Sequence, residues 1–561
     1  MVPNSFVIKI NGTRDINGKV EYKTDNLTLE TLDICDNHIQ LKKCSDGFSI
    51  FFGEATQHPF DDGNMPSGTL IEYGSSKNQL LIKSDRLGTC TAYWRKSGSS
   101  LAISNRLENL ALGVTQPDWS SIQQYLHTGF TVGSSTFYEN VFQTTPNLYV
   151  SVCTISSRME TSHRSVPKTS QYKSHNEILE EISDQLEIGL KRAHRSVLMM
   201  SAGWDSRTLL VGPKPNISAC YSHGDLNSRE ISIARSISGN QRHNHIFVDV
   251  KNCKFDTDLI ERMLLEVGFC VFPIWYLASQ NIQRWDGNPI MSGVLGELLG
   301  GHYGLMAWGS RLQKIAASLS LVNNSLISEN QINHAIDRYC KPPKTHWFVS
   351  EEGQEILDVN RTKTKSRVLE AIIQQHSTSG SWLRTIEDFN MSHRARQYIL
   401  KQAQSASSTV GYTIPFADEH LTDLIRQLDF KHRVHNKANR YILRKRNPIL
   451  LGQPMAATLI PASYPILAQE LTRVIRVAGE QFSKILGKQP PRLGWFNYQH
   501  LYDNDTLHNL TDSIDSGIWD KKKMHQSIRS NPNNQVDAGS TLDMICKIKT
   551  VDHYLLYLKN Q

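Results

Sequence analysis

The stretch that decides the fold is SVLMMSAGWDSRTLL, residues 196–210. Residues 196–200 form a short, uncharged and largely apolar run, which is typical of a buried strand. The turn SAGWDS follows at 201–206, and the residues after it begin a helix. A turn between a buried strand and a helix offers unpaired backbone N–H groups at the positive end of the helix dipole, where phosphate or pyrophosphate binds well. The sequence therefore predicts a phosphate-binding turn at residues 201–206.

The side chains of this turn suit the same ligand. Ser201 and Ser206 carry hydroxyls that can donate to phosphoryl oxygens, and Gly203 lets the backbone approach closely. Asp205 would repel a phosphate unless a divalent cation lies between them, so its presence predicts Mg²⁺. The turn lacks the GKS or GKT of a Walker A motif. Taken alone, it is equally compatible with a helix start capped by Ser or Asp.

Strand and helix patterns alternate on both sides of the turn. Upstream, Ser174 and Glu177 form a capping-box pattern before apolar residues at four-residue spacing, which predicts a helix. Downstream, the apolar runs 217–221 and 245–250 flank a helical segment at 229–237. Alternating strands and helices at this spacing indicate a parallel α/β sheet, with nucleotide chemistry at the carboxyl ends of its strands.

The rest of the chain divides around this sheet. Residues 1–160 contain short alternating or apolar runs between Gly, Asn and Asp clusters, which indicates a β-rich domain. The polar stretch 158–173, rich in Ser, Thr and Arg, predicts a linker. From about residue 255 onward the pattern is mostly helical. We therefore expect an α/β and α+β protein with domains at 1–160 and 174–470 and a helical, polar C-terminal extension at 471–561.

Composition is that of a soluble globular protein. The 561 residues are 39% hydrophobic and 20% charged, with a formal net charge of +7. We expect a cytoplasmic protein that does not enter a membrane, because no apolar stretch approaches ~18–20 residues and the N-terminus lacks a signal-peptide core. Nine scattered cysteines without a CxxC pair favour neither a disulfide framework nor a zinc site. The basic run 521–523 is interpreted as a solvated surface rather than a nucleic-acid contact.

Several motifs, in order along the chain, resemble those of the asparagine synthetase family, whose corresponding turn is SGG-x-DS. The stretch from SDRLG at 84–88 to SNRL at 104–107 is similar to the family's D-x-x-G…Y-Y…S-x-x-L. Segment 221–224, YSHG, stands where the family has F-S-x-G. Segment 292–301, SGVLGELLGG, resembles its S-G-x-G-x-D-x-x-x-G, and IPFAD at 414–418 resembles its R-x-P-F-x-D. These matches occur in order between about residue 80 and residue 450.

The resemblance implies both a fold and an activity. The fold would be an N-terminal class II glutamine-amidotransferase-like β-sandwich, followed by an adenine-nucleotide α-hydrolase-like (PP-loop) parallel-sheet domain. The activity would be that of an ATP-dependent ligase that adenylates a carboxylate, releases pyrophosphate and transfers the acyl group to ammonia or an amine. Asp205 and Glu297 match the family's two acidic Mg²⁺ ligands, with Glu in place of Asp at position 297. The positions that line ATP or pyrophosphate in the family correspond to Met200, Ser201, Gly203, Asp205, Ser206, His223, Ser292 and Gly293, although His223 is equally compatible with a solvated turn.

The sequence departs from the family at other catalytic positions. Val2 stands where glutamine-using members carry a nucleophilic cysteine, so we expect a silent glutaminase domain. The family's late lysine has no counterpart in a matching motif, and the basic cluster 444–446 near its place is interpreted as a helix end that favours cations. Glu387 and Asp388 are candidates for the acidic residue beside the reacting amine, without a motif to support them. The catalytic lysine, acid and base are therefore unassigned.

Three functions remain compatible with these residues. The enzyme forms an amide from ammonia or a separate amine, or the amine lies within the substrate and the product is a ring. Lasso-peptide cyclases and β-lactam synthetases resemble asparagine synthetases in this second way, and they also lack the cysteine. The third function is that of a degenerate synthetase that binds a nucleotide or a partner protein without catalysis. For the enzyme, the implied partners are a small-molecule or peptide carboxylate and an amine, with a partner protein or a homo-oligomer left open.

Overall fold

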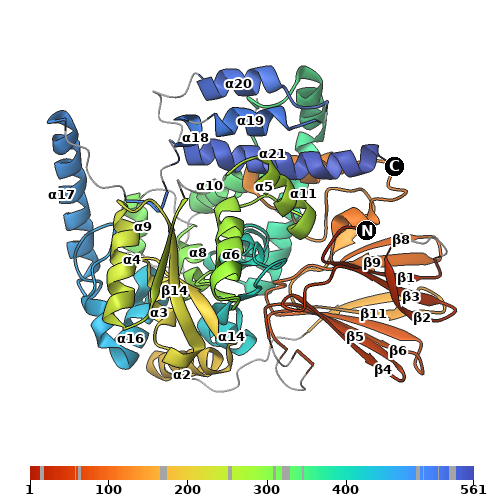
Figure 1. Cartoon of the computed structure of the whole chain (residues 1–561), viewed down its shortest axis with the longest axis horizontal. Coiled ribbons are helices and arrows are strands. Elements are labelled where there is room, and N and C mark those ends of the chain that lie inside the picture. The colour runs from red at the N-terminus through yellow and green to blue at the C-terminus, as the bar shows by residue number, and fades with distance from the viewer. Residues whose placement is uncertain are drawn as a thin grey trace.

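The computed structural model in Figure 1 describes residues 1–12, 18–56, 59–60, 65–164, 173–250, 255–306, 311–318, 329–343, 346–487, 493–496, 498, 500–503, 505–515, 517–529 and 538–560. Two antiparallel sheets and one parallel sheet organise these residues. The antiparallel sheets lie together at one end of the molecule, and the parallel sheet lies beside them among helices. The expected mixture of parallel α/β structure with antiparallel sheets is confirmed at this level.

The N-terminal part of the chain folds mainly as two stacked antiparallel sheets. In spatial order, the first contains β10 (Val141–Gln143), β8 (Tyr93–Ser97), β9 (Ser100–Ser104), β1 (Ser5–Ile10), β3 (Leu27–Leu32) and β2 (Lys19–Lys23). The second contains β12 (Met159–His163), β11 (Leu148–Cys153), β7 (Gln79–Ser84), β6 (Gly68–Gly74), β5 (Gly47–Gly53) and β4 (Ile39–Cys44). The rings of Phe6 and Phe52, one from each sheet, meet edge to face with centroids 5.3 Å apart. The two sheets therefore share an apolar interior, as in a β-sandwich.

A five-stranded parallel sheet forms around the stretch 196–210. Its spatial order is β15 (His245–Asp249), β14 (Ile217–Gly224), β13 (Ser196–Met199), β16 (Ile290–Met291) and β17 (Tyr412–Thr413), and each neighbouring pair is parallel. The chain begins at the central strand β13, moves outward through β14 and β15, and then adds β16 and β17 on the other side. The winding direction thus reverses between β13 and β16. Ligands of open parallel sheets bind outside the carboxyl ends of the strands at such a switch point.

Helices surround the parallel sheet and form most of the C-terminal half. Helix α2 (His175–Arg192) begins with the expected capping box, in which Ser174 Oγ accepts from the Glu177 N–H and the Glu177 carboxylate accepts from the Ser174 N–H. Helices α4 (Arg229–Asn240) and α6 (Pro273–Trp285) lie on either side of β14 in Figure 1. The other helices are α1 (Trp119–Thr128), α3 (Trp204–Leu209), α5 (Thr257–Val267), α7 (Gly296–Leu299), α8 (His302–Leu305), α9 (Arg311–Ser318), α10 (Glu329–Cys340), α11 (Glu351–Ser379), α12 (Trp382–Phe389), α13 (Lys401–Gln404), α14 (Glu419–Gln427), α15 (Phe430–Arg433), α16 (Lys437–Arg446), α17 (Ile466–Ile485), α18 (His500–Asp503), α19 (Thr506–Asp512), α20 (Lys521–Arg529) and α21 (Ala538–Lys559). The chain also contains a π-helical segment, η4 (Asn390–Ile399), and the 3₁₀ turns η1 (Leu107–Leu110), η2 (Lys214–Asn216), η5 (Pro415–Ala417), η6 (Val434–Asn436) and η7 (Pro448–Gly452).

Two expectations about local structure need correction. Part of the stretch expected to be a linker is strand β12, which pairs with β11; residues 165–172 lie outside the described residues. The side chains of β12 are mostly exposed, so this edge strand shows no apolar alternation in the sequence. The mostly helical region after residue 255 also contributes strands β16 and β17. Each is two residues long, which is too short to produce a periodic signal.

Buried side chains join the sandwich to the parallel sheet. One apolar cluster includes Phe6 and Ile50 of the sandwich together with Val197 and Ile290 of the parallel sheet. Because this core is continuous, the domain boundaries expected near residues 160, 174 and 470 stay a prediction. Among the described residues, no helix has the length and apolar character to cross a lipid bilayer.

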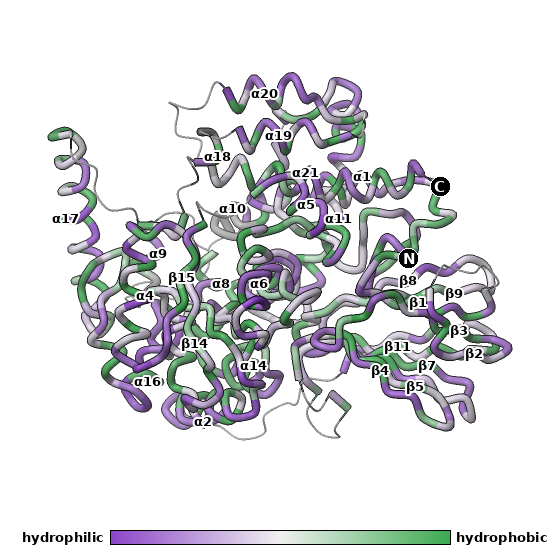
Figure 2. Tube along the Cα trace, viewed as in Figure 1, coloured by the Kyte–Doolittle hydropathy of each residue, from purple (hydrophilic) through white to green (hydrophobic). Residues whose placement is uncertain are grey.

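Helix α17 is attached to the body of the protein through its polar side. Glu480 binds both Arg476 of the same helix and Arg229 of α4. The apolar side faces solvent, and Figure 2 shows apolar segments along this projecting rod. Its exposed apolar residues are Leu467, Leu471, Val474, Ile475, Val477, Phe482 and Ile485. Polar contacts, rather than burial of an apolar face, therefore fix α17 to the protein.

A buried ion pair supports helix α7, which follows β16. Arg433 donates to both carboxylate oxygens of Glu387 at 2.6 and 2.7 Å and to the carbonyl oxygen of Leu298 at 2.9 Å. Both charged side chains are almost completely buried. Burial raises the pKa of Glu387, but the Arg433 guanidinium, together with the charges of Arg384 and Arg426, outweighs burial and lowers that pKa below its usual range. Removing one partner of such a buried ion pair is strongly destabilising, because the other charge is left buried without a partner.

Replacing Arg433 alone should destabilise the protein strongly. We expect Arg433→Met to cost about 3–5 kcal/mol, seen as a lower melting temperature in calorimetry, because Glu387 is then buried without its cation. Adding Glu387→Leu should recover much of the loss. Lys191→Met, which removes an exposed ion pair with Glu187, is the control and should change stability by less than about 1 kcal/mol. An unchanged melting temperature for Arg433→Met would contradict this account.

Candidate functional site

The turn after β13 folds back on itself through its two serines. Ser201 N–H donates to Ser206 Oγ at 3.1 Å, and the two hydroxyl oxygens lie 2.9 Å apart. Gly203 N–H donates to Ser201 Oγ at 3.0 Å, and Ala202 N–H donates to the Glu230 carboxylate at 3.2 Å. Gly203 is the N-cap of α3 and supplies no capping side chain. The interpretation of this turn as a helix start capped by Ser or Asp is therefore wrong, because no described side chain caps the first N–H groups of α3.

The turn after β16 packs directly against the first turn. A Cβ atom on Gly293 would lie 2.9 Å from the backbone nitrogen of Ser206, and one on Gly296 would lie 2.6 Å from Asp205 Oδ1. Both distances are shorter than real Cβ contacts, so only glycine fits at these two positions. Leu295, between them, has a φ of +70°, which is uncommon for a residue with a side chain. The two turns are therefore in tight contact at the switch point of the sheet.

This contact brings the carboxyl groups of Asp205 and Glu297 together. Asp205 Oδ1 and Glu297 Oε2 are buried, and neither accepts a hydrogen bond from the described residues. Burial raises the pKa of both carboxyls, and the charge of Glu297 raises that of Asp205 further. Two carboxylates with buried, unsatisfied oxygens are costly by themselves and suit a hard divalent cation.

Three more residues adjoin the carboxyl pair, and no motif in the sequence pointed to them. The Arg394 guanidinium acts on Glu297 and lowers its pKa against the effect of burial, and the Tyr303 hydroxyl lies beside the same carboxyl. The side-chain amide of Asn439 lies beside Asp205. Arg394 belongs to the π-helical segment η4, and π-helical turns often occur at functional sites. Its place beside Glu297 arises from tertiary packing, so a linear motif could not have identified it.

The remaining residues predicted to line a nucleotide lie at the ends of β13, β14 and β16. Met200 and Ser292 are completely buried, and their N–H groups bind the carbonyl oxygens of Tyr221 and Thr413. These two residues therefore hold neighbouring strands together. His223 is also buried, its Nδ1 has no hydrogen-bond partner among the described residues, and burial lowers its pKa to about 3. The alternative of a solvated turn is thus wrong for His223, whose ring is neutral.

Residues 493–496 cover the carboxyl end of β14. Asp225 N–H donates to the carbonyl oxygen of Trp495 at 2.6 Å, and the Trp495 ring centroid lies 5.4 Å from that of His223. Burial raises the pKa of Glu230 to about 7, against hydrogen bonds from the Ala202 N–H and the Trp495 side chain. Trp495 therefore closes one side of the turn after β13. No sequence pattern indicated this contact, because about 290 residues separate Trp495 from the turn.

Other residues that the sequence suggested have structural partners instead. Glu387 pairs with Arg433, and Asp388 pairs with Arg426 at 2.8 Å. In the basic cluster 444–446, Lys445 binds Glu180 and Arg446 binds Glu187, both on helix α2. Glu387 and Asp388 are both held in ion pairs, and their suggested role beside a reacting amine stays a prediction.

Position 2 carries no nucleophile in the sandwich. Val2 is 3% exposed, and its N–H donates to Asn109 Oδ1 at 3.1 Å. The first cysteine along the chain, Cys35, places its Sγ 3.5 Å from the carbonyl oxygen of Thr409. Burial raises the pKa of the Cys35 thiol, so it is not activated as a thiolate.

The metal site would consist of two protein carboxylates. Within the described ranges, no three or more His, Cys, Asp or Glu side chains are grouped so that they could hold a metal. Mg²⁺ is commonly held by one or two carboxylates, with waters and substrate phosphates as its other ligands. No protein-family model and no curated protein matches the chain. The assignment of this site therefore depends on its own geometry.

Neutralising Asp205 should stabilise the metal-free protein at neutral pH. The folded-state pKa values of Asp205 and Glu297 lie above the ~3.9 and ~4.3 of unfolded chains, so the folded state binds more protons and stability falls as the pH rises above about 4. We expect Asp205→Asn in EDTA to weaken this fall and to raise the melting temperature at pH 7.5.

A divalent cation should stabilise the wild-type protein but not the Asp205→Asn variant. Mg²⁺ is expected to raise the melting temperature of the wild-type protein and to have little effect on Asp205→Asn, as measured by scanning fluorimetry. Asp184→Asn, which changes an exposed carboxylate paired with Arg446, should behave like the wild type. An equal response to Mg²⁺ in wild type and Asp205→Asn would show that the cation binds elsewhere.

Proposed function

We propose that the protein is an ATP-dependent, amide-forming ligase of the asparagine-synthetase type, with Mg²⁺ as its cofactor. The observation that carries the proposal is the buried carboxyl pair of Asp205 and Glu297, which adjoins the turn 201–206 at the switch point of a parallel sheet. A phosphate-binding turn beside two unsatisfied carboxylates fits a nucleotide triphosphate together with a metal ion. Five motifs in register support the same family.

In this proposal each residue of the site has a defined task. The first N–H groups of α3, together with Ser201 and Ser206, bind the pyrophosphate portion of ATP. Asp205 and Glu297 hold the Mg²⁺, which supplies positive charge to the phosphoryl oxygens. Arg394 places a further cation beside Glu297, where negative charge would gather during the reaction.

The proposed chemistry has two steps. An oxygen of the substrate carboxylate attacks the α-phosphorus of ATP, and pyrophosphate leaves with the electron pair of the broken bond. The nitrogen of ammonia or an amine then attacks the acyl carbon, AMP leaves, and the nitrogen loses a proton. Activation is needed because a carboxylate is a poor electrophile and AMP is a good leaving group.

The sandwich is proposed to be a class II amidotransferase-type domain that does not hydrolyse glutamine. Its two stacked antiparallel sheets are compatible with that fold. Val2 is packed inward, and Cys35 is not activated. The nitrogen therefore comes from free ammonia or from an amine-bearing substrate, and in the second case the product is linear or cyclic.

A second candidate is a degenerate synthetase that binds a nucleotide or a partner without catalysis. One observation favours it: the Glu230 carboxylate already accepts from Ala202 N–H, and Trp495 closes the adjoining strand end. A ligand would have to displace or share these contacts. Binding of ATP without exchange of pyrophosphate would select this candidate.

The first test of the ligase is ATP–pyrophosphate exchange over a panel of carboxylates, with hydroxylamine added to trap the activated acyl group as a hydroxamate. We expect exchange and hydroxamate with at least one carboxylate. Asp205→Asn should lower the rate by about 10²–10³-fold, because charge at the phosphoryl groups is no longer neutralised. Asp184→Asn is the matched control and should retain the wild-type rate. Equal rates in wild type and Asp205→Asn would contradict the assigned site.

The nitrogen source gives a separate expected outcome. Glutamine should yield no glutamate, with or without ATP, because Val2 offers no nucleophile. Ammonium or an added amine should support amide formation under the same conditions. The Cys35→Ser variant should match the wild type in both assays, whereas a glutaminase activity that disappears in Cys35→Ser would overturn the interpretation of the sandwich as silent.

A further inference from the structure

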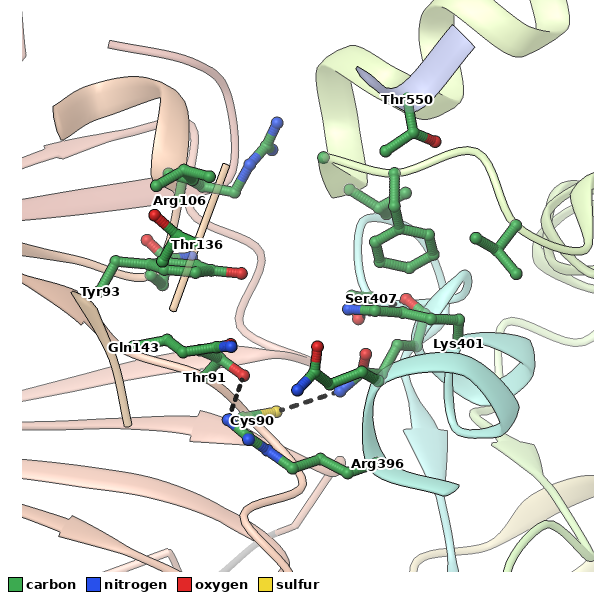
Figure 3. A pocket seen from close by; sticks show the side chains of 18 of the residues that line it. Cys90, Thr91, Tyr93, Arg106, Thr136, Gln143, Arg396, Lys401, Ser407 and Thr550 are labelled. Carbon is green, nitrogen blue, oxygen red and sulfur yellow. Dashed lines mark hydrogen bonds between the residues drawn. The ribbon is translucent and has the colours of Figure 1, made fainter. Parts of the chain in front are cut away.

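A cavity lies between the sandwich and the helical part of the protein, apart from the carboxyl pair. Its volume is about 130 Å³, roughly ten times the ~10–15 Å³ that one water needs. Figure 3 shows Tyr93, Gln143 and Arg106 on the sandwich side and Lys401 and Ser407 on the opposite side. Thr550 and Tyr554 of the C-terminal helix α21 also line the cavity. The cavity is therefore large enough for a small organic molecule of up to about ten non-hydrogen atoms.

The ammonium group of Lys401 lacks a counter-ion. It lies 4.1 Å from the centroid of the Phe269 ring, and it makes no hydrogen bond or ion pair with any described residue. Burial, with smaller contributions from the charges of Arg396 and Arg106 and against an opposing effect of Cys90, lowers the pKa of Lys401 to about 8. The group thus remains mostly protonated at pH 7. Lys401 is half-buried, and a partly desolvated ammonium that faces only an aromatic ring is costly unless an anion joins it.

The other charges around the cavity do not supply that anion. Arg106 is already paired with Glu108, at 2.5 Å. Arg396 donates to the carbonyl oxygens of Gly88 and Thr144 and to Thr91 Oγ1. These acceptors are neutral, so Arg396 adds a second positive charge to the wall without adding a carboxylate.

Two carboxylates near the cavity are engaged elsewhere. Glu266 accepts hydrogen bonds from the hydroxyls of Tyr276 and Ser408. Asp85, which acts on Arg396 from a distance, accepts from the N–H groups of Gly68, Leu87 and Thr89. Neither forms an ion pair with Lys401. The wall of the cavity is thus positive where Lys401 and Arg396 face it.

Gln404 adds a second, independent feature. This residue lines the cavity, is 7% exposed, and donates through its side-chain nitrogen to the carbonyl oxygen of Thr89. Its Oε1 is buried and accepts no hydrogen bond from the described residues. Lys401 and Gln404 both belong to helix α13, so the unpaired cation and the unpaired acceptor lie within one turn of each other. A ligand that satisfies both must combine an anion with a nearby hydrogen-bond donor.

We propose that this cavity binds a small organic acid with a hydrogen-bond donor next to its carboxylate, such as a short hydroxy acid or amino acid. The carboxylate binds the Lys401 ammonium, and the hydroxyl or amino group donates to Gln404 Oε1. Thr91, Thr136 and Ser407 also line the wall. The hydroxyls of Thr136 and Ser407 already donate to backbone carbonyl oxygens, so towards a ligand they can act only as acceptors. The proposal does not depend on the ATP site, because binding here needs neither ATP nor a metal.

A titration of the full chain with four probes tests the proposal at pH 7 in EDTA and without ATP. Glycolate and glycine carry both the carboxylate and the donor, acetate carries only the carboxylate, and glycolamide carries no charge. Ligand-observed NMR should give a Kd for glycolate or glycine at least about tenfold lower than that for glycolamide, with acetate in between. Equal affinity for glycolate and glycolamide would overturn the proposal, as would binding of inorganic phosphate with no binding of any carboxylate.

Variants locate the bound acid. Lys401→Met should weaken glycolate binding about tenfold or more, and Gln404→Leu should remove the difference between glycolate and acetate. Lys43→Met, which removes an exposed lysine paired with Glu21, should leave both affinities unchanged. Wild-type affinity for glycolate in a folded Lys401→Met protein would refute the assignment. The comparison of the four probes on the wild-type protein decides the proposal even if a variant does not fold.

Discussion

Close contact between Gly296 and the Asp205 carboxyl is the constraint on which the site depends. The turn after β16 can reach the turn after β13 only because neither Gly293 nor Gly296 carries a Cβ atom. This approach places Glu297 beside Asp205 and leaves an oxygen of each carboxyl buried without a donor. Parallel pairing of β13 with β16 sets the distance between the two turns. Any larger residue at either glycine would push the two carboxyl groups apart. The cation site that we propose would then be lost.

The surrounding structure holds these turns in place through buried polar contacts. Arg207, completely buried just after Asp205, donates to the carbonyl oxygens of Ala202, Leu450, Gln453 and Pro454. It therefore fixes the first turn against the segment around η7. Arg433 performs the same task for α7. Both are long cationic side chains that satisfy backbone oxygens where no helix or sheet could do so. The π-helical segment η4 contributes to both sites, since Arg394 acts on Glu297 and Arg396 lines the cavity beside the sandwich.

The sequence predicted the elements whose signals are local. The run 196–200, the capping box at Ser174 and the apolar run 217–221 led to β13, α2 and β14, because short-range periodicity and capping chemistry dictate them. Strands β16 and β17 were missed since two residues carry no period, and β12 was missed since an exposed edge strand has no apolar face. Within the site, the motifs indicated Asp205 and Glu297. Arg394, Asn439 and Trp495 reach the site only through tertiary packing, which a linear pattern does not encode.

The central claim is that Asp205 and Glu297 jointly hold a divalent cation at the switch point of the parallel sheet. The most direct measurement is anomalous diffraction at the manganese edge from crystals grown with Mn²⁺ and a non-hydrolysable ATP analogue. The account predicts an anomalous peak in contact with both carboxyl groups, with the phosphates of the analogue bound at the turn 201–206. Clear density for the analogue with no manganese between Asp205 and Glu297, or manganese at a different place, would contradict it.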